Sequence, residues 1–344
     1  MKRTTVITLV LVVVMVMIMF VGCKAAPAEV PAAPAAEEPA AEEPAAEEPA
    51  AEEPAAEEPA KKIKIGVSMQ GLDAPYVVSV KKHVEAAVAA AGPNVEAIIL
   101  DGQANAEKQV SQVENFIAQK VDAIILNPIA YDGCAPAVDA ANKAGIPIIT
   151  LITRVQNQDL TATHSGSDHK ESGIIEAEAV AEFMGGKGNI VVIEGVMGID
   201  AQIQRMEGYS EVLANYPEIK IVAQNTAAWQ RDQALDLVEN WLQSGKQFDV
   251  VLAQNDNMAM GALKAIEDAG LADTIKVFGI DGDNDALQAV KDGRLYATVF
   301  QDAKGQAETA VTAAITLANG GTVDKEYIIP FQLVTTDNVN DFLK

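Results

Sequence analysis

The chain is short of basic residues, cysteines and histidines. Its 344 residues include 25 Lys and Arg against 49 Asp and Glu, which gives a formal net charge of −24. Nucleic-acid binding needs clustered Lys and Arg, so this charge argues against nucleic acid as a partner. The 2 cysteines cannot form a disulfide framework, and a chain this long can bury a core that needs none. No Ser–His–Asp order or nucleophile elbow is recognisable, so we do not predict an enzyme.

The first 22 residues are typical of an export signal. Lys2 and Arg3 precede an apolar stretch from Val6 to Val21, and Gly22 is followed by Cys23. A basic start, an apolar run and a small residue before a cleavage site describe a secretory signal peptide. Because a cysteine follows directly, residues 1–22 resemble a bacterial lipoprotein signal, which implies cleavage before Cys23 and a lipid on its sulfur. An uncleaved transmembrane anchor is the alternative, since about 20 apolar residues can span a bilayer. Either way we predict an exported chain, anchored to a membrane of the cell envelope.

Residues 23–60 have the composition of a tether. The unit Ala-Glu-Glu-Pro-Ala repeats five times between Ala36 and Ala60. Regular prolines block a continuous helix, the glutamates repel one another, and no large apolar side chain is present to build a core. We predict a disordered spacer. If Cys23 carries lipid, Cys134 is the remaining thiol, and its apolar neighbours indicate a packed core residue.

From Lys61 onward, short runs rich in Val and Ile alternate with stretches that carry apolar residues at helical spacing. Continuous apolar strands separated by helices indicate mainly parallel sheets that are buried on both faces. The strands are too many for one compact doubly wound sheet, so we predict two α/β lobes with a crossover near 164–168, where His164 and His169 have hinge or surface roles. The expected strands are 63–69, 95–100, 123–126, 146–151, 190–193, 219–223, 250–253 and 277–280, and the clearest helices are 77–91, 107–119, 174–184, 231–243 and 258–269.

Polar side chains follow the ends of several expected strands: Asn127, Arg154, Asn255, Asp281 and Gln301. In such sheets ligands bind beyond the carboxyl ends of the strands. Amides and carboxylates match the paired donors and acceptors of vicinal hydroxyls, and aromatic rings cover the C–H faces of a sugar. The pattern therefore predicts a site for a polyhydroxylated ring. At each position taken alone, a helix cap or a turn residue is the alternative.

Several segments resemble the ribose-type periplasmic sugar-binding proteins. They are 126–128, 205–209, 253–263, 279–282 and 297–301, in the family's order, and the resemblance covers residues 61–344. It implies a periplasmic binding protein-like I fold with two doubly wound, Rossmann-like lobes and a three-segment hinge. The lobes would be 61–165 plus 302–329 and 166–301 plus 330–344. It also implies a sugar held in the cleft, a monomeric protein, and delivery of the sugar to the permease subunits of an ABC transporter.

The resemblance also implies roles for single residues. Asn127, Asn255, Asp281 and Gln301 match hydroxyl-binding positions, Arg154 matches an arginine, Tyr76 and Trp229 match aromatic positions, and Asp73 stands beside the family's asparagine position. Other positions depart from the ribose pattern: Ala74, Val77 and Thr153 replace contact residues, and a second arginine expected near Gln202 and Ile203 is missing. These departures imply another monosaccharide or a cyclic polyol as the ligand.

The sequence can also be compared with a signalling receptor, a transcription regulator and a calcium-binding loop. A sugar or quorum-signal receptor for chemotaxis or signalling would share the fold and is the alternative. The sugar-sensing half of a transcription regulator would need a basic helix-turn-helix where this chain has an acidic spacer. Residues 281–285 resemble the start of a calcium loop, but Ala286 occupies the position that requires glycine. We therefore predict no metal and no cofactor.

Overall fold

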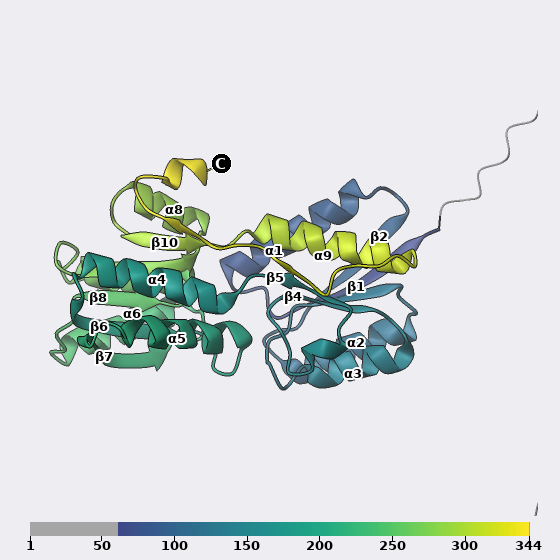
Figure 1. Ribbon diagram of the computed structural model, residues 1–344, viewed down its shortest axis with the longest axis horizontal. Helices are drawn as coiled ribbons and strands as arrows, with labels where there is room; N and C mark the ends of the chain where they lie inside the picture. Colours follow the sequence, from purple (N-terminus) through teal and green to yellow (C-terminus); the bar gives the residue numbers. More distant parts are fainter. Residues whose placement is uncertain (1–60, 344) are drawn as a thin grey trace, which may run out of the picture. The chain divides into compact units, whose positions relative to one another are not determined.

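The computed structural model describes residues 61–343. The predicted signal peptide, Cys23 and the tether lie outside the described residues. Within 61–343 the chain forms two six-stranded sheets, each covered by helices on both faces (Figure 1). No helix in this range is both long and apolar enough to cross a membrane.

The first sheet has the strand order β11-β5-β4-β3-β1-β2, and all its neighbours pair in parallel. Helices α1 and α9 pack together on one face, and α2 and α3 pack together on the other (Figure 1). We call these elements the N-lobe. Their bounds are β1 Ile63–Met69, α1 Pro75–Ala90, β2 Val95–Asp101, α2 Ala106–Ala118, β3 Ala123–Leu126, α3 Ala135–Ala144, β4 Ile148–Ile152, the 3-10 helix η1 Gln158–Leu160, β5 Thr163–Gly166, α9 Ala303–Ala318 and β11 Glu326–Ile328.

The second sheet has the order β12-β10-β9-β8-β6-β7 and is parallel except that β12 runs antiparallel to β10. Helices α4 and α5 pack together, as do α6 and α7. We call these elements the C-lobe. Their bounds are α4 His169–Phe183, β6 Lys187–Glu194, α5 Asp200–Leu213, β7 Glu218–Thr226, α6 Arg231–Gln243, β8 Val250–Ala253, α7 Asp256–Asp268, β9 Lys276–Asp281, α8 Asn284–Lys291, β10 Ala297–Phe300, β12 Gln332–Val334 and the 3-10 helix η2 Val339–Asp341.

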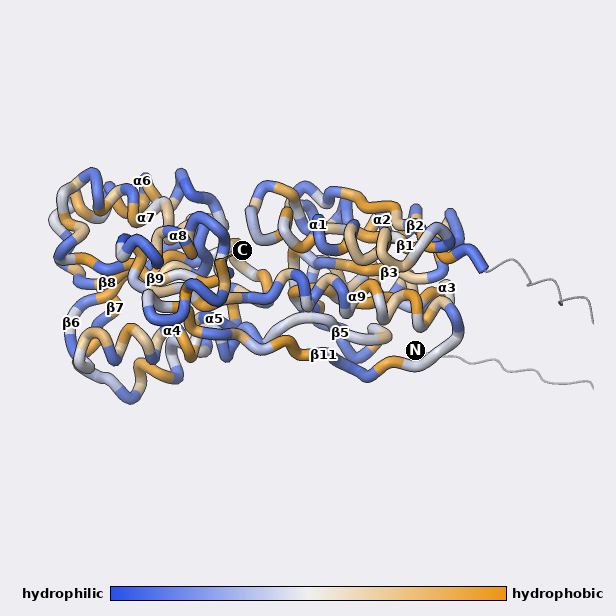
Figure 2. The backbone as a smooth tube through the Cα atoms, turned by 90° about the horizontal axis from the view of Figure 1, so that it is seen from above, coloured by the Kyte–Doolittle hydropathy of each residue, from blue (hydrophilic) through white to orange (hydrophobic). Residues whose placement is uncertain are grey.

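The central strands are apolar because helices cover both of their faces. Every residue of β3 and β8 is buried, and Figure 2 shows hydrophobic residues gathered along these strands. The edge strand β7 is largely exposed by comparison. Cys134 is fully buried, as its apolar neighbours predict, and its Sγ lies 3.3 Å from Gln109 Oε1.

The chain passes between the lobes three times, after β5, β10 and β11. Asp168 and Asp302 cap the helices that follow the first two crossings, since their carboxylates accept hydrogen bonds from backbone N–H groups of α4 and α9. Two parallel-sheet α/β lobes with three connections confirm the predicted fold class. The short strands β11 and β12 were not expected, because three residues are too few for a periodic pattern.

Candidate functional site

A cavity lies where the carboxyl ends of strands from both sheets meet. Its lining residues leave about 410 Å³ free of protein atoms, and this space includes open solvent. The segments that follow β1 and β4 line it from the N-lobe, and those that follow β6, β7, β8, β9 and β10 line it from the C-lobe. The lining residues are Gln70, Ala74, Tyr76, Val77, Ile152, Thr153, His169, Ile199, Ala201, Arg205, Trp229, Asn255, Asp281 and Gln301.

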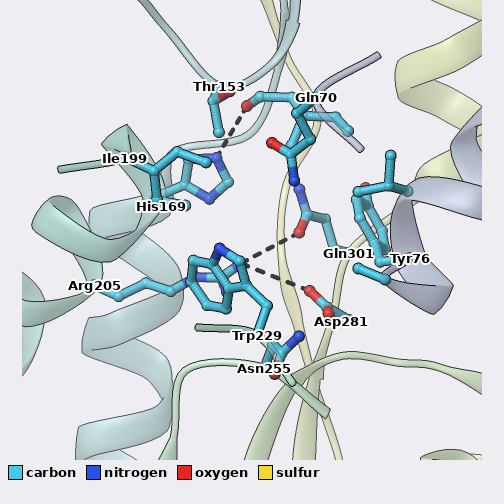
Figure 3. A pocket seen from close by; sticks show the side chains of 14 residues that line it. Gln70, Tyr76, Thr153, His169, Ile199, Arg205, Trp229, Asn255, Asp281 and Gln301 are labelled. Carbon is cyan, nitrogen blue, oxygen red and sulfur yellow. Dashed lines mark hydrogen bonds and ion pairs between the residues drawn. The ribbon is translucent and has the colours of Figure 1, made fainter. Parts of the chain in front are cut away.

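Five of the predicted ligand residues line this cavity: Tyr76, Trp229, Asn255, Asp281 and Gln301 (Figure 3). Asn255 is also the N-cap of α7, because its Oδ1 accepts from Met258 N at 2.9 Å. Its cap bond uses the oxygen and leaves the amide nitrogen for the cavity. The buried Nε2 of Gln301 has no protein partner, so it is a second donor for a ligand oxygen.

The other three predicted residues, Asp73, Asn127 and Arg154, do not line the cavity. Asp73 is exposed and accepts from Gln230 Nε2 at 2.6 Å. Asn127 is fully buried. Its Oδ1 accepts a hydrogen bond from Gln70 N, and its Nδ2 donates one to Leu151 O. It therefore holds the ends of β1 and β4 in place.

Arg154 differs from its predicted role because of the backbone at the end of β4. Ile152 has a φ of 69°, in the left-handed region. After this turn Thr153 lines the cavity, and the Arg154 guanidinium pairs with Glu326 at 3.1 Å. Such a conformation is unusual for a β-branched residue, and the sequence carries no sign of it.

Sequence reasoning missed Arg205, which is 3% exposed and lines the cavity from α5. Its Nη1 donates to Gln254 O, and its Nη2 donates to Gln301 Oε1 at 3.3 Å and lies 3.7 Å from Asp281 Oδ1 (Figure 3). The signal was present, because a second arginine was expected near Gln202, and a residue three positions later lies on the same helix face.

His169 also lines the cavity, although a hinge or surface position was expected. Its ring is 1% exposed, and Nε2 lies 2.9 Å from Ile152 O. A carbonyl only accepts, so Nε2 carries the proton. Burial lowers the pKa of His169 well below its ordinary value, which keeps the ring neutral. Its buried Nδ1 has no protein partner and can accept from a ligand hydroxyl.

Asp281 is the one carboxyl side chain among the residues that line the cavity. Burial raises the pKa of Asp281 well above its ordinary value. The nearby Arg205 opposes this shift, while Asp283 and Asp256 add to it. Asp256 itself does not line the cavity, because its carboxylate accepts from Gly282 N, Asp283 N and Thr298 Oγ1. This shell of hydrogen bonds fixes the turn that follows β9 and thereby orients Asp281.

The Trp229 ring is held by an unusual loop before α6. Ala228 and Trp229 have φ values of 50° and 65°, and Asn257 Nδ2 donates to Trp229 O at 2.8 Å. The six-membered ring fills the space that a Cβ at Gly195 would need. The Arg205 guanidinium carbon lies 5.8 Å from the ring centroid, within cation–π range. Strained backbone that is fixed in this way is typical of functional sites.

The lobes also touch each other directly around the cavity. Tyr131 N donates to Gly198 O at 3.3 Å, and Arg154 N donates to Asp200 Oδ2 at 3.0 Å. The bond between Asp73 and Gln230 is a third link of this kind. Within residues 61–343, no group of three or more His, Cys, Asp or Glu side chains is arranged to hold a metal ion.

The arrangement suits a neutral, polyhydroxylated molecule. One guanidinium, three amides, one carboxylate and one neutral imidazole supply donors and acceptors to hydroxyl groups. Two aromatic rings from different lobes supply surfaces for C–H faces.

Comparison with known proteins agrees with this description. Residues 65–322 match the family described as "Periplasmic binding protein domain". The chain is 37% identical to a xylitol-binding protein of Mycolicibacterium smegmatis over 72% of this chain and 70% of that protein. It is 35% identical to a ribose import binding protein of Bacillus subtilis over 80% of this chain and 88% of that protein.

A solved structure is similar over most of the described residues. It is an ABC transporter solute-binding protein from Bacillus halodurans with bound myo-inositol, at 40% identity and a TM-score of 0.79, covering 82% of this chain and 97% of that one. The members of this family are solute-binding proteins and not enzymes, as the sequence predicted. The chain therefore belongs to the ribose-type periplasmic binding proteins.

Proposed function

We propose that this chain captures a monosaccharide or a cyclic polyol in the cavity between its lobes and delivers it to an ABC importer. The observation that carries this proposal is the convergence of Arg205, Asn255, Asp281 and Gln301 beside the Trp229 ring. The named ligands of the relatives, which are xylitol, ribose and myo-inositol, are all neutral and polyhydroxylated.

Binding works by closure of the two lobes. The lobes are residues 61–165 with 302–329 and residues 166–301 with 330–344, and the chain crosses between them near Gly166, Gln301 and Ile329. Ligand contacts from both lobes stabilise the closed state relative to the open one. The closed monomer then docks on the permease subunits of the transporter.

A ligand panel tests the proposal. The full chain, purified in detergent, is heated with pentoses, hexoses, acyclic polyols and inositols, and hits are measured by titration calorimetry. A ligand that binds only the folded state stabilises it by about 2.7 kcal/mol at a concentration of 100 Kd. We expect a rise in Tm with a small subset of the panel. If no neutral polyhydroxylated compound raises the Tm, the proposal is wrong.

We further propose that residues 1–22 are removed and that Cys23 anchors the chain to a membrane through a lipid, with residues 23–60 as the spacer. This follows from the signal-like start of the sequence. Cells that produce the chain are fed an alkyne-tagged fatty acid and fractionated. We expect the wild type to be labelled and membrane-bound, and Cys23→Ser to lose both properties.

Cys134→Ser is the matched control, because it removes the other cysteine, which is buried in the N-lobe core. It should keep the label. Label that survives Cys23→Ser would contradict the proposed anchor.

A further inference from the structure

The two lobes contribute different chemistry to the cavity. The C-lobe side carries the charged and amide groups, namely Arg205, Asn255, Asp281 and Gln301 together with His169. The N-lobe side is mostly hydrocarbon: Ala74, Tyr76, Val77 and Ile152 line the cavity and pack in one cluster of the N-lobe core.

The two aromatic rings of the cavity can each cover one face of a ring-shaped ligand. In Figure 3 the Asp281 carboxylate and the Gln301 amide lie between the rings of Trp229 and Tyr76. The Tyr76 hydroxyl is occupied, because it donates to Gln306 Oε1 at 2.8 Å outside the cavity. Tyr76 therefore has no hydroxyl proton left for a ligand, and it offers the hydrocarbon surface of its ring and an oxygen that can only accept. The aliphatic residues are left to meet the ligand's edge, where its substituents project.

Few polar groups of the N-lobe can form hydrogen bonds with substituents at the edge of the ligand. Thr153 lines the cavity, but its hydroxyl donates to Pro128 O at 2.9 Å and can therefore only accept from a ligand. The Gln70 side chain also lines it, and its Oε1 accepts from Asn127 Nδ2 at 3.4 Å. Gln70 Nε2 remains for one hydroxyl of the ligand, while the surface of Ala74, Val77 and Ile152 offers neither donor nor acceptor.

A hydroxyl held against that surface would lose its water without gaining a partner, and burying an unpaired polar group is unfavourable. A methyl group or a bare methylene in the same place would be buried favourably. We propose that the ligand is a deoxy or methyl-substituted sugar or cyclic polyol, with its hydrocarbon position against Ala74, Val77 and Ile152. This rests on the proposed function, since it concerns the ligand of the same cavity.

Matched ligand pairs test the inference. Titration calorimetry compares D-galactose with D-fucose, D-glucose with 6-deoxy-D-glucose, and myo-inositol with its mono-O-methyl ethers. In the pair that binds, we expect the deoxy or methylated member to bind about tenfold more tightly, which is typical of one methyl-sized group in an apolar pocket. Equal or tighter binding of the fully hydroxylated member in every binding pair overturns the inference but leaves the proposed function intact. Failure of all the pairs and of the wider panel overturns both.

Two variants of α1 test whether the preference for the deoxy or methylated ligand arises at the apolar wall. Val77→Thr places a hydroxyl on the apolar wall with little change in size, and we expect it to reduce the affinity ratio within the binding pair at least about threefold. Val78→Thr is the matched control, because Val78 is the next residue of α1 and does not line this cavity. It should keep the wild-type ratio. If Val77→Thr folds and keeps the wild-type affinity ratio, the hydrocarbon group of the ligand does not lie against Val77. If Val77→Thr does not fold, the affinity ratio of the wild type alone decides the inference.

Discussion

Replacing Trp229 with alanine is expected to weaken ligand binding about 30- to 1,000-fold, while the protein still unfolds in one cooperative transition. Buried aromatic anchors at the centre of a binding site contribute about 2–4 kcal/mol when they are truncated. Trp229 is 8% exposed, covers one side of the cavity, and lies within cation–π range of Arg205. Its loss removes the stacking surface and leaves Arg205 without that neighbour. Titration calorimetry with the ligand found by the panel measures the effect.

The chain offers a matched control for this experiment, because it has 2 tryptophans. Trp241 lies on α6 and packs in the core outside the cavity. Trp241→Phe should leave the affinity unchanged, and Trp229→Phe should give an intermediate loss because a smaller ring remains. An affinity of Trp229→Ala within about twofold of the wild type would show that the ring does not touch the ligand.

Asp281→Asn is expected to weaken binding by about 2–5 kcal/mol, or roughly 30-fold at least. The substitution keeps the shape of the side chain but removes the charged acceptor. It also leaves the guanidinium of Arg205, 3% exposed, without the carboxylate that now lies 3.7 Å away. The buried charge of Arg205 is then uncompensated, which is unfavourable. The ligand hydroxyls also face an amide in the variant in place of the carboxylate of the wild type.

Asp273→Asn is the control for this change, since Asp273 is an exposed turn residue between α7 and β9. It removes the same charge from the chain and should not alter the affinity. If the Asp281 and Asp273 variants bind with equal affinity and circular dichroism shows both to be folded, Asp281 does not contact the ligand.

The sequence predicted several residues at strand ends that line the cavity in the structure. Gln301 directly follows β10, Asn255 comes two positions after the end of β8, and Asp281 is the last residue of β9. Parallel strands bring their carboxyl ends to one edge of a sheet. The fold followed from the same pattern, because buried parallel strands and amphipathic helices have distinct periods. The boundaries of most expected elements lie within a few residues of those in the structure.

The remaining site residues depend on geometry that a sequence does not display. Arg154 turns away because Ile152 adopts a left-handed conformation. The strand-end pattern predicts Asn127 as a ligand residue, yet its amide oxygen and nitrogen both bond to backbone atoms. His169 and Arg205 lie on the helices α4 and α5, and a pattern of polar residues at strand ends does not include them.

The direct links between the lobes affect how tightly any ligand can be held. The bonds of Tyr131 with Gly198, Arg154 with Asp200 and Gln230 with Asp73 join the lobes through protein atoms alone. They raise the fraction of empty molecules that are already closed, and the apparent Kd is the intrinsic Kd divided by the competent fraction. Evolution can therefore adjust the affinity at the rim of the cavity while the specificity set by its interior stays the same. The transporter, in turn, must break these rim bonds as well as the ligand's own contacts before it can receive the cargo.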